Sequence, residues 1–192
     1  LECVRRAGRL ADAALAAGLA RTEPGADEGH ILAAMQGAVF EGGGDYPGNE
    51  FIIGSGRDAL LCRYKSGRRR LDARDQLTLE FAGTWRRYHA ALMHTVVIGA
   101  PRPGHPAMHA ACREALAACE ERMRPGRTAG EVFDAHASVM DAHGMAAHRL
   151  NACGYSLGAA FTPSWMDPPM FYAGNDWVLE PGMALFAHMI LM

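Results

Sequence analysis

The stretch LTLEFAGTWRRYHAALMHTVVIG, residues 77 to 99, decides the fold class, because it predicts two β-strands joined by a short turn. Leu77, Leu79 and Phe81 alternate with polar residues, which is the period of a strand with one face on a core. Glu80 is the only carboxylate in this stretch. Such a group has a partner, lies in water on an outward face, or has a raised pKa that suits it to proton transfer or nucleophilic attack.

Length and composition bound the class of protein. The 192 residues, of which 49% are hydrophobic, suffice for one domain with a substantial core. A net charge of −2 gives no electrostatic reason to expect nucleic acid or an anionic membrane as a partner. No apolar run reaches the roughly 18 residues of a membrane span, and the five cysteines form no CxxC pair. We expect a soluble cytoplasmic protein with reduced thiols, in which Cys112 and Cys119 pack on one helical face.

Periodicity and turn residues predict four helices and four strands. The expected helices cover residues 1–19, 27–40, 106–123 and 129–143. The expected strands cover residues 51–53, 59–64, 76–82 and 88–98, with Gly54-Ser55-Gly56 as the turn between the first two.

An internal repeat relates the two halves of the chain. Pro24-Gly25 and Pro125-Gly126 each separate the members of a helix pair, and the two turns lie 101 residues apart. The repeat predicts two pseudo-symmetric halves with a site at their junction, because pockets favour such interfaces. The alternative is that two Pro-Gly turns resemble each other by chance.

Four motifs follow one another along the chain. They are the Pro-Gly turns, the strand pair of residues 77–99, the loop Gly154-Tyr155-Ser156-Leu157-Gly158, and Glu180-Pro181-Gly182-Met183 before the last strand. In order and spacing they resemble the family of methionine aminopeptidases, Xaa-Pro peptidases and creatinase.

The resemblance covers nearly the whole chain and implies an α+β pita-bread domain over residues 1–192, with pseudo-twofold helix pairs packed on a curved antiparallel sheet. It also implies a homodimer and an N-terminal domain that helps to close the site. Since the chain opens inside a helix pattern at Leu1 and stops in a strand-like run at Met192, we expect that domain and the end of the pita-bread domain to be absent.

The sequence departs from the family at the metal ligands. The family carries two aspartates eleven residues apart on the strand pair, where this chain has Glu80 and Ala91. A family histidine falls on Tyr155, a glutamate on His188, and a further histidine, seventeen residues ahead of the first acid, on Arg63. A dinuclear site needs several carboxylates and imidazoles around the ions. We therefore expect no metal and no other cofactor.

Three segments, LTLEFAGTWRRYHAA, HRLNACGYSLG and FAHMILM, are similar to the ectoine hydrolase version of these motifs. This likeness implies a metal-independent hydrolase that opens a C–N bond of a small cyclic amidine, most simply ectoine. A creatinase-like hydrolase, an Xaa-Pro peptidase-like hydrolase and a non-catalytic binding module on the same scaffold are the alternatives.

Amidine hydrolysis needs a group that attacks or activates water and a group that moves a proton. Glu80 is the candidate nucleophile or general base. His188 is the candidate proton shuttle, on the premise of an unperturbed pKa near 6.5. Tyr155 either donates a hydrogen bond to developing charge or fills the space of a missing imidazole. Arg63 either clamps a substrate carboxylate or lies in solvent at a strand end.

The remaining candidates are substrate-binding residues. Trp165 is expected near the pocket, because an aromatic wall suits a delocalised cation. Tyr88 and His89, at the start of the second strand of the pair, complete the predicted substrate-binding set. His89 and His94 are five residues apart and so face opposite sides of a strand, which excludes them as joint metal ligands.

The loop of residues 154–158 also matches the G-x-S-x-G pattern of serine hydrolases, with Asp167 or Asp176 and then His188 in the chain order of a triad. That elbow requires Ser156 at a strand-to-helix turn of a parallel sheet. The chain before it predicts helix pairs and hairpins, so we expect this match to be without catalytic meaning.

Overall fold

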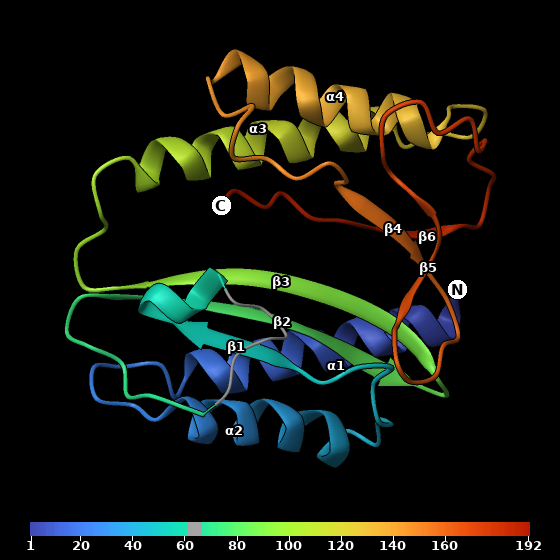
Figure 1. Cartoon of the computed structure of the whole chain (residues 1–192). Coiled ribbons are helices and arrows are strands. Elements are labelled where there is room, and N and C mark those ends of the chain that lie inside the picture. The colour runs from blue at the N-terminus through green and yellow to red at the C-terminus, as the bar shows by residue number, and fades with distance from the viewer. Residues whose placement is uncertain (61–66) are drawn as a thin grey trace. The chain divides into compact units, whose positions relative to one another are not determined.

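The computed structural model describes residues 1–60 and 67–192 and divides the chain into two compact units (Figure 1). Unit 1 comprises Leu1–Pro101 and Gly158–Trp165, and unit 2 comprises Arg102–Leu157 and Met166–Met192. In the described residues, no helix combines the length and the apolar character that crossing a membrane requires.

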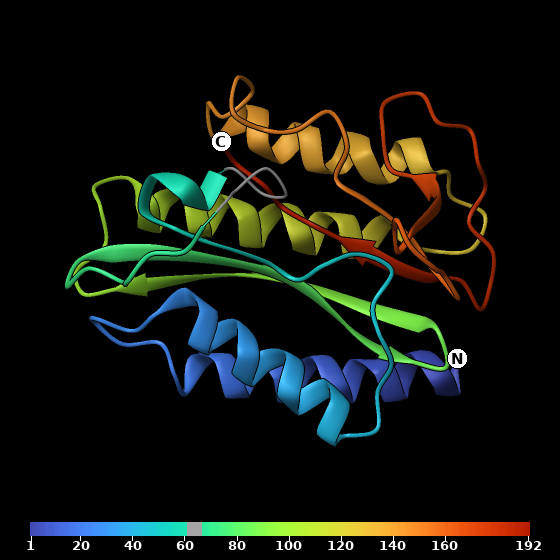
Figure 2. The ribbon, with the colours of Figure 1, turned by 60° about the horizontal axis from the view of Figure 1, so that its bottom comes forward.

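Unit 1 is a three-stranded antiparallel sheet with the order β1-β2-β3 and two helices on one face (Figure 2). Its elements are α1 (Glu2–Leu19), α2 (Glu28–Glu41), β1 (Ile52–Ser55), the 3₁₀ helix η1 (Gly56–Leu60), β2 (Asp75–Trp85) and β3 (Tyr88–Ile98). The expected helices and the strand pair are therefore present.

One face of β2 packs against the two helices of unit 1. Leu77, Leu79 and Phe81 are fully buried and pack in one cluster with residues of α1 and α2. Side chains alternate between the faces of a strand. Glu80 consequently lies on the face of the sheet that α1 and α2 do not cover.

The connection after β1 differs from the expected hairpin. Gly54 and Ser55 belong to β1 itself, and Gly56–Leu60 forms a 3₁₀ helix rather than the start of a strand. Gly56 has a φ of +57°, which bends the chain directly out of the strand. The apolar pattern of residues 59–64 predicted a strand that is wrong up to residue 60, and residues 61–64 lie outside the described part of the chain.

Unit 2 has the same helix-pair-and-sheet composition. Its elements are α3 (His105–Arg122), α4 (Ala129–Ala142), β4 (Gly154–Leu157), β5 (Met166–Met170) and β6 (Ala184–Ala187). The strands form an antiparallel sheet with the order β5-β4-β6. Cys119 of α3 and Phe133 of α4 pack on Cys153 and Phe171, so the helices and this sheet share one core. Cys112 packs in a neighbouring cluster, as its helical position predicted.

The repeat is present in the backbone hydrogen bonds of the two units. Gly25 has a φ of +84° and donates to the Leu71 carbonyl at 2.7 Å, and Leu71 donates back to Ala26 at 2.9 Å. Gly126 has a φ of +86° and donates to the Leu179 carbonyl at 2.9 Å. In unit 2 the return bond runs from the Leu179 N–H to the Arg127 carbonyl at 2.7 Å.

The residues after these turns cap the following helices. The Asp27 carboxylate accepts from the Gly29 N–H at the start of α2, and the Thr128 hydroxyl accepts from the Glu131 N–H at the start of α4. Glu131 completes a capping box by accepting from the Thr128 N–H at 2.7 Å. Chance resemblance of two Pro-Gly turns does not account for a shared scheme of turn, strand contact and cap.

At Gly83 the backbone of β2 lies close to the backbone of α1. A Cβ atom at Gly83 would overlap the backbone of Ala7 and Ala11, which cannot move aside as a flexible side chain can. We predict that Gly83→Ala lowers the free energy of unfolding by about 2–3 kcal/mol, as overpacking does. Gly37→Ala in α2 meets no atom within 4 Å and is expected to stabilise by about 0.5–1 kcal/mol. Urea denaturation of both variants checks the pair, and equal effects would contradict the close approach.

Candidate functional site

Glu80 lies in the central strand of unit 1. It pairs with Ile52 of β1 and with Met93 of β3, and its side chain is half-buried. Directly paired residues of antiparallel strands share a face. The same face therefore continues through the pair of Ala82 and Ala91. Two small side chains thus lie next to the carboxylate along the sheet.

His89 lies on the Glu80 face near the end of the hairpin, paired with Thr84, whereas His94 pairs with Leu79 on the helix-covered face. The prediction that the two histidines face opposite sides is confirmed. His89 is fully buried, and its Nε2 accepts a hydrogen bond from the Gly48 N–H at 2.8 Å. Since Nε2 must carry a lone pair to accept, the ring is neutral with the proton on Nδ1.

Trp165 packs beside His89. Its ring centroid lies 6.3 Å from that of His89, and its side chain is fully buried. Tyr88 is 38% exposed and forms a β-bridge with Ala159. The burial of His89 and Trp165 gives both a packing role in unit 1. Substrate contact by these residues and by Tyr88 stays a prediction, and Arg63 lies outside the described residues.

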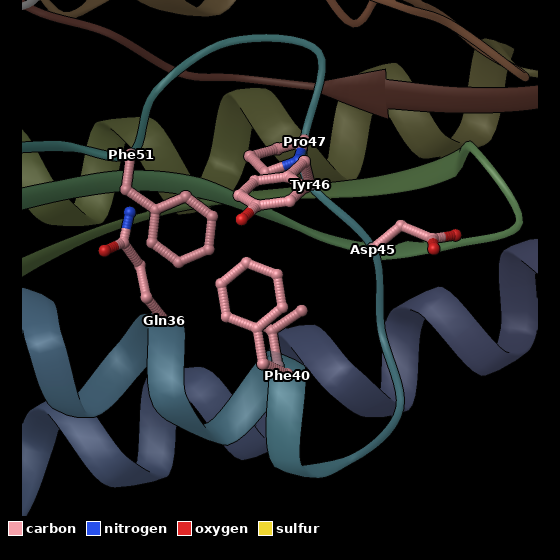
Figure 3. A pocket seen from close by; sticks show the side chains of 7 residues that line it. Gln36, Phe40, Asp45, Tyr46, Pro47 and Phe51 are labelled. Carbon is pink, nitrogen blue, oxygen red and sulfur yellow. The ribbon is translucent and has the colours of Figure 1, made fainter.

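A cavity of about 100 Å³ opens between α2 and residues 45–51 of unit 1. Figure 3 shows the rings of Phe40, Tyr46 and Phe51 around it, while the Asp45 side chain points away from them. None of the predicted site residues lines this cavity.

In unit 2, His188 follows β6 directly. Its N–H donates to the Cys153 carbonyl at 2.9 Å, which continues the pairing of β6 with β4. Met183, Leu185 and Met189 pack in the core with α3 and α4. By alternation, Phe186 and His188 lie on the face of the sheet that the helices do not cover.

Three rings meet on that face and form what we call the aromatic triad, Tyr155, Phe186 and His188. The ring centroids lie 5.2 Å apart for Tyr155 and Phe186, 5.8 Å for Tyr155 and His188, and 5.7 Å for Phe186 and His188. Tyr155 is buried, and the other two are half-buried. Tilted contacts at these separations are favourable for aromatic rings.

The electrostatics of His188 differ from the expectation. Burial, with a smaller contribution from the charge of His136, lowers the pKa of His188 to about 4. The premise of an unperturbed pKa near 6.5 is therefore wrong. At neutral pH the imidazole is uncharged, so it begins any reaction as a proton acceptor or a neutral hydrogen-bonding group.

Glu80 and His188 occupy equivalent positions in the two units. Glu80 lies nine residues after Leu71, and His188 lies nine residues after Leu179, the residues that bind the Pro-Gly turns. Each also lies on the helix-free face of its own sheet. The repeat therefore gives the two predicted catalytic residues the same local setting.

Ser156 has no elbow geometry. It lies inside β4, between two antiparallel neighbours, and its hydroxyl donates to the Ala184 carbonyl at 3.4 Å. The expectation that the G-x-S-x-G match has no catalytic meaning agrees with this placement.

Sequence reasoning missed two residues of unit 2. Phe186 is two residues before His188, and this spacing on a strand could have indicated a shared face. His136 of α4 is 1% exposed, and neither ring nitrogen has a hydrogen-bond partner in the described residues. Its position in the helical pattern gave no signal that separates it from an ordinary core residue.

A profile of metallopeptidase family M24 matches residues 2–190, so the chain belongs to this family. The ectoine hydrolase of Halomonas elongata is 27% identical over 194 residues, which cover 95% of this chain and 48% of the relative. The Xaa-Pro dipeptidase of Pyrococcus furiosus is 22% identical, with coverage of 96% and 52%. The chain thus spans about half the length of the curated relatives it matches.

Solved structures give the fold. The prolidase from Pyrococcus furiosus matches with a TM-score of 0.91 at 21% identity, covering 100% of this chain and 56% of that structure. The X-Pro aminopeptidase from Thermotoga maritima matches with a TM-score of 0.89 at 18% identity, covering 100% and 53%. The predicted α+β pita-bread fold is confirmed.

The donors at the family's metal positions do not fit a two-metal centre. Ala91 has no donor atom, and neither has Ala82, its partner across the strands. Within residues 1–60 and 67–192, no group of three or more His, Cys, Asp or Glu side chains could hold a metal ion.

The buried hydrogen bond of His89 predicts a stability effect. In a His89→Leu variant the Gly48 N–H loses its acceptor inside the protein, which costs about 2 kcal/mol. His30→Leu on the exposed surface of α2 is the matched control and is expected to stay within about 0.5 kcal/mol of the wild type. Chemical denaturation measures both, and a His89→Leu variant as stable as the control would contradict a stabilising role for this hydrogen bond.

The lowered pKa of His188 predicts loss of stability in acid. Between pH 6.5 and about 4 the unfolded chain binds a proton at this residue and the folded chain does not, so stability falls as the pH falls. The full contribution is about 3 kcal/mol. We expect a His188→Gln variant to lose less stability than the wild type between pH 7 and pH 4.5 in denaturation experiments.

Proposed function

We propose that this chain is the catalytic part of a metal-independent M24 hydrolase that opens a C–N bond of a small zwitterionic cyclic amidine, with ectoine as the substrate. The observation that carries the proposal is the donor set at the family's metal positions, where Ala91 cannot bind a cation and His188 replaces a carboxylate. The 27% identity to the ectoine hydrolase of Halomonas elongata supports the same substrate.

The reaction adds water to the carbon between the two nitrogens of the amidinium. In one route Glu80 removes a proton from water, and the hydroxide adds to that carbon. In the other route the Glu80 carboxylate adds first and forms an ester-like intermediate, which water then cleaves. Either route gives a tetrahedral carbon, and collapse of that centre breaks one C–N bond and opens the ring.

His188 moves the proton that the leaving nitrogen requires. Because it is neutral at the start, it can accept a proton from the water or the tetrahedral centre and return it to the departing nitrogen. Tyr155 contacts the His188 ring at 5.8 Å between centroids and holds its orientation. A tyrosine hydroxyl can also donate a hydrogen bond to developing charge.

Four further residues are proposed to bind the substrate. Arg63 is the proposed partner of the substrate carboxylate, since a guanidinium binds a carboxylate through two parallel hydrogen bonds. Trp165, Tyr88 and His89 are proposed to shape the pocket near the hairpin of unit 1. The active species is proposed to be a homodimer, as the family resemblance implies, and to be cytoplasmic, since the five cysteines form no CxxC pair and fit a reducing compartment.

A peptidase is the second candidate. The Xaa-Pro dipeptidase of Pyrococcus furiosus matches 96% of this chain, which favours an Xaa-Pro peptidase-like or creatinase-like activity on the same scaffold. A two-metal peptidase would need ligands that the Ala91 position does not supply. A non-catalytic binding module would bind ectoine without converting it, so turnover separates it from both enzymes.

We predict that Glu80→Gln in the full chain lowers kcat for ectoine opening by about 10²- to 10⁴-fold, since glutamine can neither take a proton nor form the ester. Ectoine binding, measured by calorimetry, should persist. Glu41→Gln at the exposed end of α2 is the matched control and should retain wild-type turnover. Turnover unchanged by Glu80→Gln would remove Glu80 from the mechanism.

Metal dependence is tested on the same protein. After exhaustive dialysis against a chelator, ectoine turnover is expected to stay at its starting value, and added Mn²⁺ or Co²⁺ is expected to leave it unchanged. Metal-restored cleavage of an Xaa-Pro dipeptide, with no ectoine turnover, would establish the peptidase instead.

A further inference from the structure

The aromatic triad presents a specific surface on unit 2. Residue pairing of β4 with β6 places Tyr155 opposite Phe186, and the bond from the His188 N–H to Cys153 extends this register by one pair. Tyr155 is buried beneath the group, while Phe186 and His188 keep part of their surface exposed. The exposed part of the triad is therefore formed by two ring side chains held by a rigid strand pair.

The charge state of the triad suits a cation. His188 is uncharged at neutral pH because burial disfavours its protonated form. A protonated imidazole would repel a positive ligand, whereas three neutral rings offer negatively polarised faces. The replacement of a family carboxylate by His188 thus leaves an uncharged, aromatic surface at this position.

Hydrogen-bonding capacity at the triad is also incomplete. The Nδ1 atom of His188 is buried and has no hydrogen-bond partner among the described residues. A buried ring nitrogen without a partner costs free energy and calls for a role. The triad therefore combines aromatic rings with an imidazole nitrogen whose hydrogen-bonding capacity is unused among the described residues.

We propose that the aromatic triad Tyr155, Phe186 and His188 is a binding subsite for a planar, delocalised nitrogen cation of the amidinium or guanidinium class. Such a cation spreads its charge over a flat face, which stacks on aromatic rings, and carries N–H donors in its plane. A neutral amide has the same shape without the charge. The subsite rests on the proposed function and deepens it, since it selects charged amidines over peptide-like amides.

The experiment compares two probes of matched shape, acetamidine, which is cationic at neutral pH, and acetamide, which is neutral. Each is titrated into the full chain and followed by NMR shifts of unit 2 resonances. We expect acetamidinium to bind at least ten times more tightly than acetamide. Phe186→Leu should weaken acetamidinium about 2- to 30-fold, the range of a cation–π contact, and leave acetamide unchanged.

Matched variants separate ring chemistry from folding. Phe186→Tyr keeps an aromatic face and should restore acetamidinium binding, and Phe186→Met fills a similar volume without a ring and should behave as leucine does. Tyr172→Leu removes an exposed ring elsewhere in unit 2 and should change nothing. Thermal melts of each variant verify that binding is compared between folded proteins.

Equal affinity for the two probes, or acetamidinium binding unchanged in both Phe186→Leu and Phe186→Met, would overturn the subsite. Ectoine turnover by the wild type would then still stand, and with it the proposed function. Conversely, probe binding as expected without any ectoine turnover would retain the subsite and reject the proposed reaction.

Discussion

The placement of the two candidate catalytic residues depends on a pair of backbone hydrogen bonds in each unit. The left-handed glycine after each Pro turn donates to Leu71 or Leu179, and the same leucine donates back to the residue after the glycine. This link ties the helix pair to the chain that enters β2 or β6. Because side chains alternate along a strand, a fixed entry point also fixes which residues face the helices. Glu80 and His188, each nine residues further on, are thereby directed to the helix-free face.

In unit 1 a network of hydrogen-bonded charged side chains adds to this link. Glu28 is 1% exposed and accepts hydrogen bonds from the Ser55 hydroxyl at 2.6 Å and the Arg69 N–H at 3.0 Å. Arg69 in turn donates to Asp75 at 2.8 Å, and the pKa of Asp75 is held below its usual range by two backbone N–H groups and Arg69 against the cost of burial. Loss of one partner from such a network leaves the others buried and unpaired, so it behaves as a unit. Unit 2 has Ala129 and Trp177 at the positions equivalent to Glu28 and Arg69, and its link is set by the capping box and apolar packing instead.

The elements that could be predicted from the sequence are those with a clear hydrophobic period. All four helices end within one residue of their expected bounds, and β3 matches its expected range, because amphipathic repeats and Pro-Gly turns are local signals. The 3₁₀ helix after β1 was missed because a short apolar run fits several backbone conformations. The return of Gly158–Trp165 to unit 1 depends on long-range bonds such as that from the His89 N–H to the Gly158 carbonyl at 3.1 Å, which no local pattern encodes. For the same reason the uncharged state of His188 was not predictable, since it arises from burial in the folded unit.

In the proposed mechanism, the two equivalent positions carry different side chains for an electrostatic reason. In a two-metal relative, acids at both positions are compatible because the cations offset their charge. In the proposed metal-independent site Ala91 supplies no ligand beside Glu80, and a carboxylate at position 188 would meet the rings of Tyr155 and Phe186. Burial of such an unpaired charge is costly. An imidazole avoids that cost because it can be neutral. The lowered pKa of His188 has the same cause, since burial disfavours the charged form of the ring. The neutral His188 and the alanine at position 91 are therefore both compatible with the proposed metal-independent chemistry.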